Sequence, residues 1–155
     1  GAWCGTWAKA IEPFDEKVIA FEPDKTHFEC LQRNCTINCT PRMEAVGAQL
    51  QEVSLTEDNF TQAKRVDEKG NIRMITLDHM EYEDVDMIKI DVEGYEMEVL
   101  KGATKTLESV KYLMIELNNN TKKYGSNNVE VEKHISSLGF KVLMDHWPDK
   151  VFYRP

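Results

Sequence analysis

Short apolar runs recur along the chain, and each is closed by a glycine, a proline or a stretch of polar residues. Runs of about four to eight residues with such boundaries are typical of buried strands. The strands expected from this pattern are residues 18–21, 43–46, 51–55, 71–77, 87–92, 112–117, 140–144 and 150–153. The pattern is clearest in residues 87–92, where apolar side chains fill every position except Lys89 and Asp91.

Helical patterns separate several of these strands. Residues 24–34 place Phe28 and Leu31 on one face, and the Asp24 side chain can cap the helix that they form. Further helices are expected from Thr6, over residues 96–107, and over residues 129–138 before Gly139. Alternating strands and helices imply a mostly parallel sheet with helices on both faces.

The last two strands are joined by residues 146–149, a connection too short for a crossover, so they are expected to form an antiparallel hairpin. A polar excursion joins the strands expected at 51–55 and 71–77. The sequence therefore predicts an α/β fold with a mostly parallel sheet and a C-terminal antiparallel hairpin. Its 155 residues are enough for one domain, residues 1–155.

Composition excludes several classes of partner. The hydrophobic fraction of 41% and the charged fraction of 30% are ordinary for a globular protein, and no apolar run approaches the ~20 residues that span a bilayer. The net charge of -8 and the scattered lysines and arginines argue against a nucleic-acid partner, which requires clustered cationic side chains. We therefore expect a small-molecule partner, and neither nucleic acid nor membrane.

Four cysteines are present, at positions 4, 30, 35 and 39. They contain no C-x-x-C pair, and His27 is the nearest histidine, so the spacing does not favour a zinc site. We expect no metal. The thiols are expected to be reduced and packed as small apolar groups in a cytoplasmic domain.

Polar residues at the carboxyl ends of the expected strands are the candidates for ligand binding, because open parallel sheets bind ligands there. Gly1 and Gly5 form a glycine turn before a helix, which lets the backbone approach a ligand closely, although an ordinary loop has the same composition. Glu22 ends the next strand, where a carboxylate can accept hydrogen bonds from both ribose hydroxyls of a nucleoside. The alternative for Glu22 is a solvated acid before a helix cap.

Two carboxylates, Asp91 and Glu93, leave a buried strand just before Gly94. Desolvating such charges is costly unless they are paired within the protein or bind a ligand, and a sulfonium or ammonium cation would be a suitable ligand. Capping of the following helix accounts for Glu96 and Glu98. Asp91 lies too deep in the strand for that role.

The histidines are weaker candidates. His79 follows an expected strand, and His146 lies in the hairpin turn beside Trp147, so either can approach a substrate. A lone histidine in a loop is, however, more often solvated than catalytic. His27 and His134 fall inside helices and are expected at the surface.

These segments, in this order, resemble the FkbM-type family of S-adenosylmethionine-dependent methyltransferases. Most of the resemblance lies in Val85–Glu96, whose centre reads Ile-Lys-Ile-Asp-Val-Glu-Gly. The other matching residues are Gly1, Ala2, Gly5, Ala20–Pro23, Leu31, Asn34, Asn38, Ala45–Gly47, Thr76–Asp78, Val99–Leu100, Gly102–Ala103, Ile115–Glu116 and Leu138–Phe140. Together they cover nearly the whole chain.

The resemblance implies a Rossmann-like class I methyltransferase fold with S-adenosylmethionine lying across the strand ends. It also implies which part of the cofactor each of several matching segments contacts. The methionine portion is assigned to Gly1, Ala2, Trp3 and Gly5, the ribose to Glu22 and Pro23, the adenine to Glu44, Ala45 and Val46, and the methyl group to Asp91 and Glu93. Such families mostly methylate hydroxyl oxygens of sugars or similar metabolites.

Two departures from the family pattern stand out. Trp3 replaces an asparagine that the family usually has, so a local hydrogen bond would be lost. The family also places a central strand directly before Gly1, between the strands that end at Glu22 and Asp91. We therefore expect an N-terminally truncated fragment in which those two strands either pair directly or leave a gap.

The predicted activity is S-adenosylmethionine-dependent methylation of a hydroxyl on a small metabolite or sugar. Asp91 or Glu93 would orient or deprotonate the acceptor, with His79 and His146 as further candidates for the base. One alternative is a module that binds the cofactor or a nucleoside without turnover. A nicotinamide-dependent dehydrogenase is a third reading, but its full G-x-G-x-x-G motif is absent.

Overall fold

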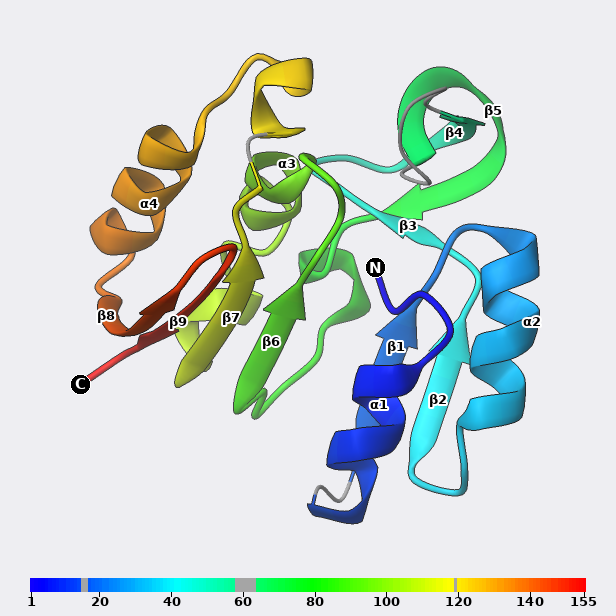
Figure 1. Cartoon of the computed structure of the whole chain (residues 1–155), viewed down its shortest axis with the longest axis horizontal. Coiled ribbons are helices and arrows are strands. Elements are labelled where there is room, and N and C mark those ends of the chain that lie inside the picture. Colours follow the sequence, from blue (N-terminus) through cyan, green and yellow to red (C-terminus); the bar gives the residue numbers. More distant parts are fainter. Residues whose placement is uncertain (15–16, 58–63, 119) are drawn as a thin grey trace.

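The fold is α/β, as the sequence predicts (Figure 1). The computed structural model describes residues 1–14, 17–57, 64–118 and 120–155. Its strands are β1 (Val18–Phe21), β2 (Cys39–Arg42), β3 (Ala45–Val46), β4 (Gln51–Glu57), β5 (Lys64–Ile75), β6 (Met87–Ile90), β7 (Tyr112–Glu116), β8 (Lys141–His146) and β9 (Asp149–Tyr153). Its α-helices are α1 (Thr6–Ile11), α2 (Lys25–Asn34), α3 (Glu96–Lys101) and α4 (Asn128–Ser137). The 3-10 segments are η1 (Glu12–Phe14), η2 (Asp78–Met80), η3 (Thr106–Glu108) and η4 (Asn120–Tyr124).

The N-terminal layer is a parallel pair of strands, β1 and β2, packed with α1 and α2. The Asp24 side chain caps α2 as predicted, because its Oδ1 accepts a hydrogen bond from the His27 amide at 2.9 Å. Leu31 of α2 is fully buried against Val18 and Ala20 of β1. This packing fixes the position of the carboxyl end of β1.

The C-terminal layer is a four-stranded sheet in the order β6-β7-β9-β8. The pair β6–β7 is parallel, and β9 is antiparallel to both β7 and β8, which confirms the predicted C-terminal hairpin. Helices α3 and α4 cover this sheet. The largest fully buried side chains of its core are Leu100, Leu107, Leu113, Ile115, Leu117, Ile135 and Phe152.

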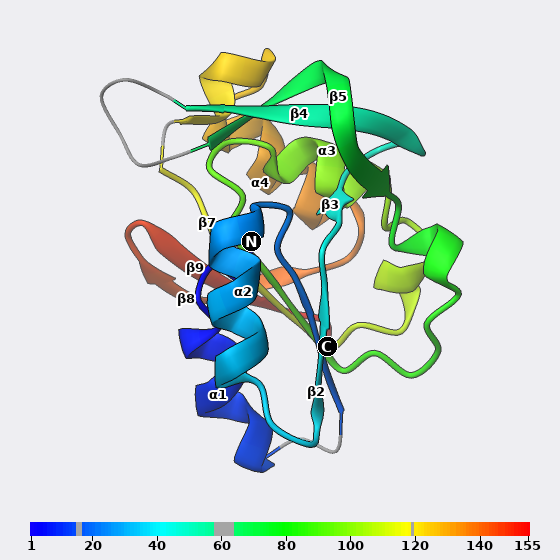
Figure 2. The same cartoon turned by 90° about the vertical axis from the view of Figure 1, so that its right-hand side faces the viewer.

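A third sheet, in the order β3-β5-β4, lies beyond the carboxyl ends of the parallel strands (Figure 2). The sequence predicts one strand over residues 43–46, whereas the structure has two separate strands, β2 and β3. Strand β2 escapes prediction because Pro41 interrupts its pattern, and proline is tolerated there because β2 is an edge strand. The connection between β4 and β5, residues 58–63, lies outside the described part of the chain.

The helix predicted over residues 96–107 is shorter in the structure. Helix α3 ends at Lys101 with Gly102 as its cap, and the segment η3 follows. A side chain at Gly102 would collide with the Gly47 carbonyl oxygen, so the glycine lets this turn approach the residues after β3. The close approach ties the third sheet to the C-terminal layer.

The sequence predicts one mostly parallel sheet, whereas the described strands form three sheets with three parallel and three antiparallel strand pairs, and no ladder joins β1 to β6. Gly1 and Ala2 lie at the carboxyl ends of both strands. The Ala2 amide donates to the Phe21 carbonyl at 2.9 Å, and a side chain at Gly1 would collide with the Asp91 carbonyl oxygen. Among the described residues, β1 and β6 therefore do not pair directly. The additional strand that the resemblance places before Gly1 stays a prediction.

A disulfide joins Cys35, at the end of α2, to Cys39, the first residue of β2, with their Cα atoms 5.2 Å apart. Cys4 and Cys30 are free thiols. The prediction of reduced cysteines is therefore wrong for the Cys35–Cys39 pair. The cytoplasmic location stays a prediction.

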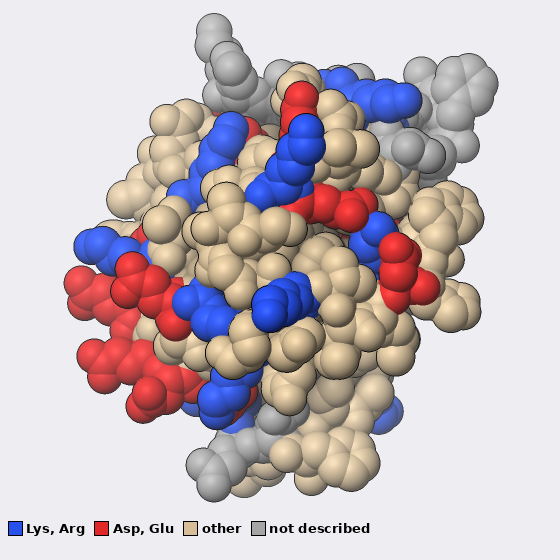
Figure 3. All heavy atoms as spheres, turned by 90° about the vertical axis from the view of Figure 1, so that its left-hand side faces the viewer, with Lys and Arg blue, Asp and Glu red and all other residues tan. Residues whose placement is uncertain are grey.

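The surface carries charges of both signs. On the face shown in Figure 3, Lys and Arg side chains are separated by acidic and uncharged residues rather than joined in one basic band. Exposed ion pairs contribute to this pattern, among them Lys111–Asp86 at 2.8 Å. Within the described ranges, no helix is both long and apolar enough to cross a bilayer.

The turn between β6 and α3 provides a test of the fold. Gly94 has a φ of 109°, and a Cβ placed there would lie 2.5 Å from the Asn120 backbone oxygen. Gly139 has a φ of 90° but no atom within 4 Å of such a Cβ. We expect Gly139→Ala to lower the free energy of unfolding by about 1–2 kcal/mol, the cost of a left-handed alanine. Gly94→Ala should cost distinctly more in urea unfolding, and equal losses in the two variants would contradict the close approach.

Candidate functional site

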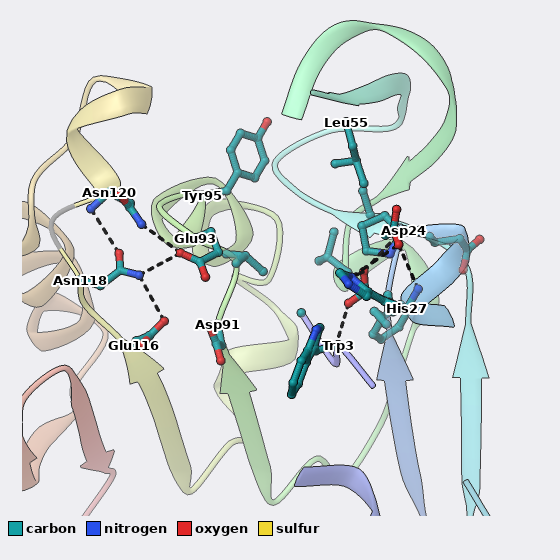
Figure 4. A pocket seen from close by; sticks show the side chains of 18 residues that line it. Trp3, Asp24, His27, Leu55, Asp91, Glu93, Tyr95, Glu116, Asn118 and Asn120 are labelled. Carbon is teal, nitrogen blue, oxygen red and sulfur yellow. Dashed lines mark hydrogen bonds and ion pairs between the residues drawn. The ribbon is translucent and has the colours of Figure 1, made fainter. Parts of the chain in front are cut away.

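A cavity of about 590 Å³ opens at the carboxyl ends of β1, β6 and β7 and beside β3 (Figure 4). The residues that line it are Gly1, Trp3, Phe21, Glu22, Pro23, Asp24, His27, Glu44, Ala45, Val46, Leu55, Asp91, Val92, Glu93, Tyr95, Glu116, Asn118 and Asn120. In Figure 4, Trp3, Asp24 and His27 lie on one side of the cavity, and Glu116, Asn118 and Asn120 on the other. The site therefore joins the two layers of the fold.

Glu22 follows β1 and is only 6% exposed. Its two carboxylate oxygens accept hydrogen bonds from the backbone, from the Trp3 amide at 2.7 Å and from the Asp24 amide at 3.0 Å. The same carboxylate lies 3.9 Å from Nδ1 of His27. Glu22 thus holds the turn of residues 1–5 against the first turn of α2, and each of its oxygens keeps acceptor capacity for a ligand.

The turn of residues 1–5 is fixed by further contacts. Asn34 of α2 donates its Nδ2 hydrogen to the Cys4 carbonyl at 2.6 Å. Trp3 has a φ of 47°, in the left-handed region where asparagine is much better tolerated than tryptophan. Its ring packs edge-on to the His27 ring, with centroids 6.3 Å apart. The unusual Trp3 therefore forms part of the cavity wall.

Asp91 and Glu116 leave the neighbouring strands β6 and β7 and share a hydrogen bond. Burial opposes ionisation of Asp91, but hydrogen bonds from Glu116 and Lys89 and the charge of Lys89 outweigh it, so the pKa of Asp91 is lowered. The Lys89 ammonium lies 2.7 Å from Asp91 Oδ2. Burial, the hydrogen bond to Asp91 and the surrounding negative charges raise the pKa of Glu116 to about 8. At neutral pH, Asp91 is the charged member of the pair and Glu116 the protonated one.

Glu93 lies at the centre of an amide network. Its Oε2 accepts hydrogen bonds from Nδ2 of Asn118 at 3.0 Å and of Asn120 at 2.9 Å. Asn118 also donates to Glu116 Oε2 at 3.3 Å. Glu93 has a φ of 55°, and strained backbone of this kind often occurs at functional sites.

A buried glutamate stabilises the turn between β6 and α3. Glu96 is 1% exposed, and its Oε1 accepts a hydrogen bond from the Gly94 amide at 2.9 Å. Burial raises the pKa of Glu96, although backbone amides of Gly94, Glu96 and Val92 oppose that rise. The carboxyl group therefore holds the loop that presents Asp91 and Glu93 to the cavity.

The wall near β3 is built by Glu44, Ala45 and Val46. The Glu44 carboxylate is already paired, since Oε2 accepts a hydrogen bond from Arg42 Nε at 2.6 Å and Oε1 lies 3.2 Å from Arg73 Nη1. With its charge balanced, Glu44 contributes a neutralised surface. Together with the apolar Ala45 and Val46, it can hold a flat uncharged ring.

Oxygen atoms of Asp91, Glu93 and Glu116 lie within 4.8 Å of one another, a grouping that a hard cation can occupy. Such groups are common without an ion. Here the Lys89 ammonium and the Asn118 and Asn120 amides already compensate these carboxylates. We therefore assign no metal to them.

The structure brings together most residues predicted for the site. The predicted residues that line the cavity are Gly1, Trp3, Glu22, Pro23, Glu44, Ala45, Val46, Asp91 and Glu93. Ala2 and Gly5 belong to the same N-terminal turn without lining the cavity, and Gly5 has a φ of 81°. His79 lies in η2 and His146 ends β8, and neither is among the lining residues.

Several lining residues escape the sequence analysis. His27 is expected at the surface as a helical histidine, but the first turn of α2 faces the cavity. Glu116 ends a buried strand that runs parallel to β6, so the rule that singled out Asp91 could have found it. Asn118 and Asn120 follow directly, but nothing in a polar loop shows that its amides bind Glu93.

The sequence and the fold of this chain are similar to those of known proteins. Residues 1–142 match the family described as "Methyltransferase FkbM domain". The hexuronic acid methyltransferase AglP of Haloferax volcanii is 29% identical over 111 residues, which cover 64% of this chain and 46% of AglP. The crystal structure of the FkbM methyltransferase from Methylobacillus flagellatus superposes with a TM-score of 0.70 at 18% identity, covering 99% of this chain and 41% of that one.

The chain thus spans less than half the length of either relative. The structural match supports the α/β fold, and the family match covers the N-terminal layer, all residues that line the cavity, and the C-terminal layer as far as the start of β8. The resemblance predicted from the Ile-Lys-Ile-Asp-Val-Glu-Gly segment is confirmed. The chain belongs to the FkbM methyltransferase domain family.

Proposed function

We propose that this chain binds S-adenosylmethionine in the cavity and transfers its methyl group to a hydroxyl of a small metabolite or sugar. The observation that carries the proposal is that Glu22 and Asp91, which end strands of different layers, line one cavity. Its volume of about 590 Å³ lies in the usual range for small-molecule sites. Family membership supports a methyltransferase but leaves the donor and the acceptor to be tested.

Each part of the cofactor finds a matching surface. Glu22 offers acceptor capacity on both oxygens, which suits the two ribose hydroxyls. Ala45 and Val46, beside the neutralised Glu44, suit the adenine ring. Asp91 keeps its negative charge and suits the cationic end of the molecule, with Gly1 allowing close approach. The carboxylate lining thus fits a nucleoside that carries a positive sulfur.

The cofactor supplies the electrophilic methyl group, and the protein aligns the acceptor and removes its proton. Those tasks fall to the carboxylates at the ends of β6 and β7, because His79 and His146 do not line the cavity and His27 lies across it from them. We infer a small-molecule acceptor rather than a nucleic acid, since no lysine or arginine is among the lining residues. A sugar acceptor is consistent with the name of the Haloferax volcanii relative, a hexuronic acid methyltransferase.

A second candidate is binding without turnover. It is favoured because no backbone ladder joins β1 to β6 among the described residues, so the two halves of the cavity are not part of one sheet. In that case S-adenosylhomocysteine binds, but no methyl group reaches any hydroxyl acceptor. Calorimetry combined with a methyl-transfer assay separates the two functions.

Glu22 provides the first test of the cofactor site. S-adenosylhomocysteine should raise the free energy of unfolding, by about 2.7 kcal/mol at a hundredfold excess over its Kd. Glu22→Gln should weaken that binding about tenfold or more, because a hydrogen-bonded charge contributes about 1.5–3 kcal/mol. Glu108→Gln, an exposed acid outside the cavity, is the matched control and should bind normally in calorimetry. Unchanged affinity in Glu22→Gln would remove Glu22 from the site.

Asp91 can be tested through the charge of the ligand. Asp91→Asn should weaken binding of S-adenosylmethionine about tenfold or more, equivalent to about 1.5 kcal/mol. Binding of S-adenosylhomocysteine, which lacks the positive sulfur, should weaken less. Asp86→Asn, which removes the exposed Asp86–Lys111 ion pair, serves as the control. Equal losses for the two ligands in calorimetry would contradict a role for Asp91 beside the sulfonium.

A further inference from the structure

We propose that Glu116 is the proton acceptor in an acceptor subsite at the end of β7, and that this subsite takes an uncharged hydroxyl compound. Glu93, Asn118 and Asn120 form the rest of the subsite. The proposal rests on the proposed methyl-transfer function and names the acceptor class and the catalytic base for it.

Position within the cavity separates this subsite from the nucleoside side. Glu22 and Asp91 follow β1 and β6, and Glu116 is the last residue of β7. Strand β7 is the neighbour of β6 on the side away from β1 (Figure 1). With the ribose at Glu22 and the sulfonium at Asp91, Glu116 is the next carboxylate along the strand ends. Figure 4 shows Glu116, Asn118 and Asn120 together, across the cavity from Trp3 and His27.

The surroundings of Glu116 make it a stronger base than an ordinary glutamate. Despite burial, the hydrogen bond from Glu116, together with the Lys89 ammonium, lowers the pKa of Asp91, so Asp91 is the ionised member of the pair. Burial is the main cause that raises the pKa of Glu116 to about 8. The hydrogen bond to Asp91 and the negative charges of Asp91, Glu93 and Asp149 raise it as well. Asp149 faces Glu116 across the β7–β9 ladder. A base with a pKa near the working pH is best suited to accept a proton in the transition state.

The proposed step balances in atoms and charge. A lone pair of the acceptor hydroxyl oxygen forms the new bond to the methyl carbon, and the carbon–sulfur bond breaks with its electrons passing to sulfur. The sulfonium becomes the neutral thioether of S-adenosylhomocysteine. The hydroxyl proton passes to the ionised Glu116 carboxylate, which later releases it to solvent. The methyl ether is the product.

Charge at the subsite selects against an acidic acceptor. Three carboxylates, Asp91, Glu93 and Glu116, border this part of the cavity, and the Asn118 and Asn120 side-chain amides donate to Glu93. Among the lining residues, His27 is the one basic side chain, and it lies across the cavity. A carboxylate on the acceptor would meet the negative charge of Asp91, with no lysine or arginine among the lining residues to pair with it, a repulsive element that gives specificity. The preferred acceptor is therefore neutral.

The acceptor class is tested by pairing neutral methyl hexosides with the matching hexuronides as acceptors. We expect methyl transfer to the neutral member of a pair to exceed transfer to the acidic member by tenfold or more in kcat/KM. Equal rates, preference for the hexuronide, or no transfer to either despite S-adenosylhomocysteine binding would overturn the neutral-acceptor proposal. A protein that binds neither S-adenosylmethionine nor S-adenosylhomocysteine would instead overturn the proposed function itself.

The base is tested by the pH dependence of the neutral-acceptor reaction. Wild-type kcat/KM should rise and level off as pH passes about 8, the pKa of Glu116 in the ligand-free protein. Glu116→Gln should lower kcat by about 10²–10⁴ and remove that rise. Asp149→Asn removes one charge that raises the pKa of Glu116, so the rise should move to lower pH with the plateau kept. A Glu116→Gln enzyme with the wild-type rate and pH profile would overturn the proposal.

Stability supplies a readout that does not depend on the acceptor. The unfolded chain releases the Glu116 proton near its ordinary value of 4.5, whereas the folded protein holds it to about 8. The folded state therefore loses stability relative to the unfolded state as pH rises between those values. Glu116→Gln should melt at a higher temperature than wild type at pH 8, and at a similar temperature at pH 4.5. A lower melting temperature for the variant at pH 8 would contradict a protonated Glu116.

Discussion

Negative charge gathered at the ends of parallel strands is the constraint on which the rest of the site depends. Glu22, Asp91 and Glu116 lie at the carboxyl ends of three strands and line one cavity, where desolvation makes their charges costly. Each is stabilised differently: Glu22 by backbone amides, Asp91 by Lys89, and Glu116 by keeping its proton. The cavity therefore carries negative charge at Asp91 and a protonated carboxyl group beside it at Glu116.

The turns at the strand ends fix the positions of these carboxylates. Residues 1–5 reach across both layers, and their turn is tied to Glu22 and to Asn34. The turn after β6 is held from below by Glu96 and allows Gly94 to approach Asn120. Backbone strain at Trp3 and Glu93 falls within the same turns. Local stability is thus exchanged for the positions of a few side chains, as is common at functional sites.

Sequence patterns were sufficient to predict the features of the fold and the site that depend on local chemistry. The Ile-Lys-Ile-Asp-Val-Glu-Gly segment identified the family, and the strand-end rule found the lining acids Glu22, Asp91 and Glu93. Trp3, Pro23 and Glu44–Val46 were predicted from the family resemblance. Strand β2 was missed because a proline on an edge strand carries no strand signal. His27, Asn118 and Asn120 were missed because their roles depend on contacts across the fold. The Cys35–Cys39 bond likewise depends on how α2 and β2 meet.

A crystal structure of the protein with S-adenosylhomocysteine would test the central claim most directly. We expect the ribose hydroxyls to donate to Glu22, the adenine to lie against Ala45 and Val46, and the sulfur to lie on the Asp91 side, with Glu116 beyond it. A ligand bound away from this cavity, or bound in it with the ribose at Glu116 and the sulfur at Glu22, would contradict the proposed arrangement.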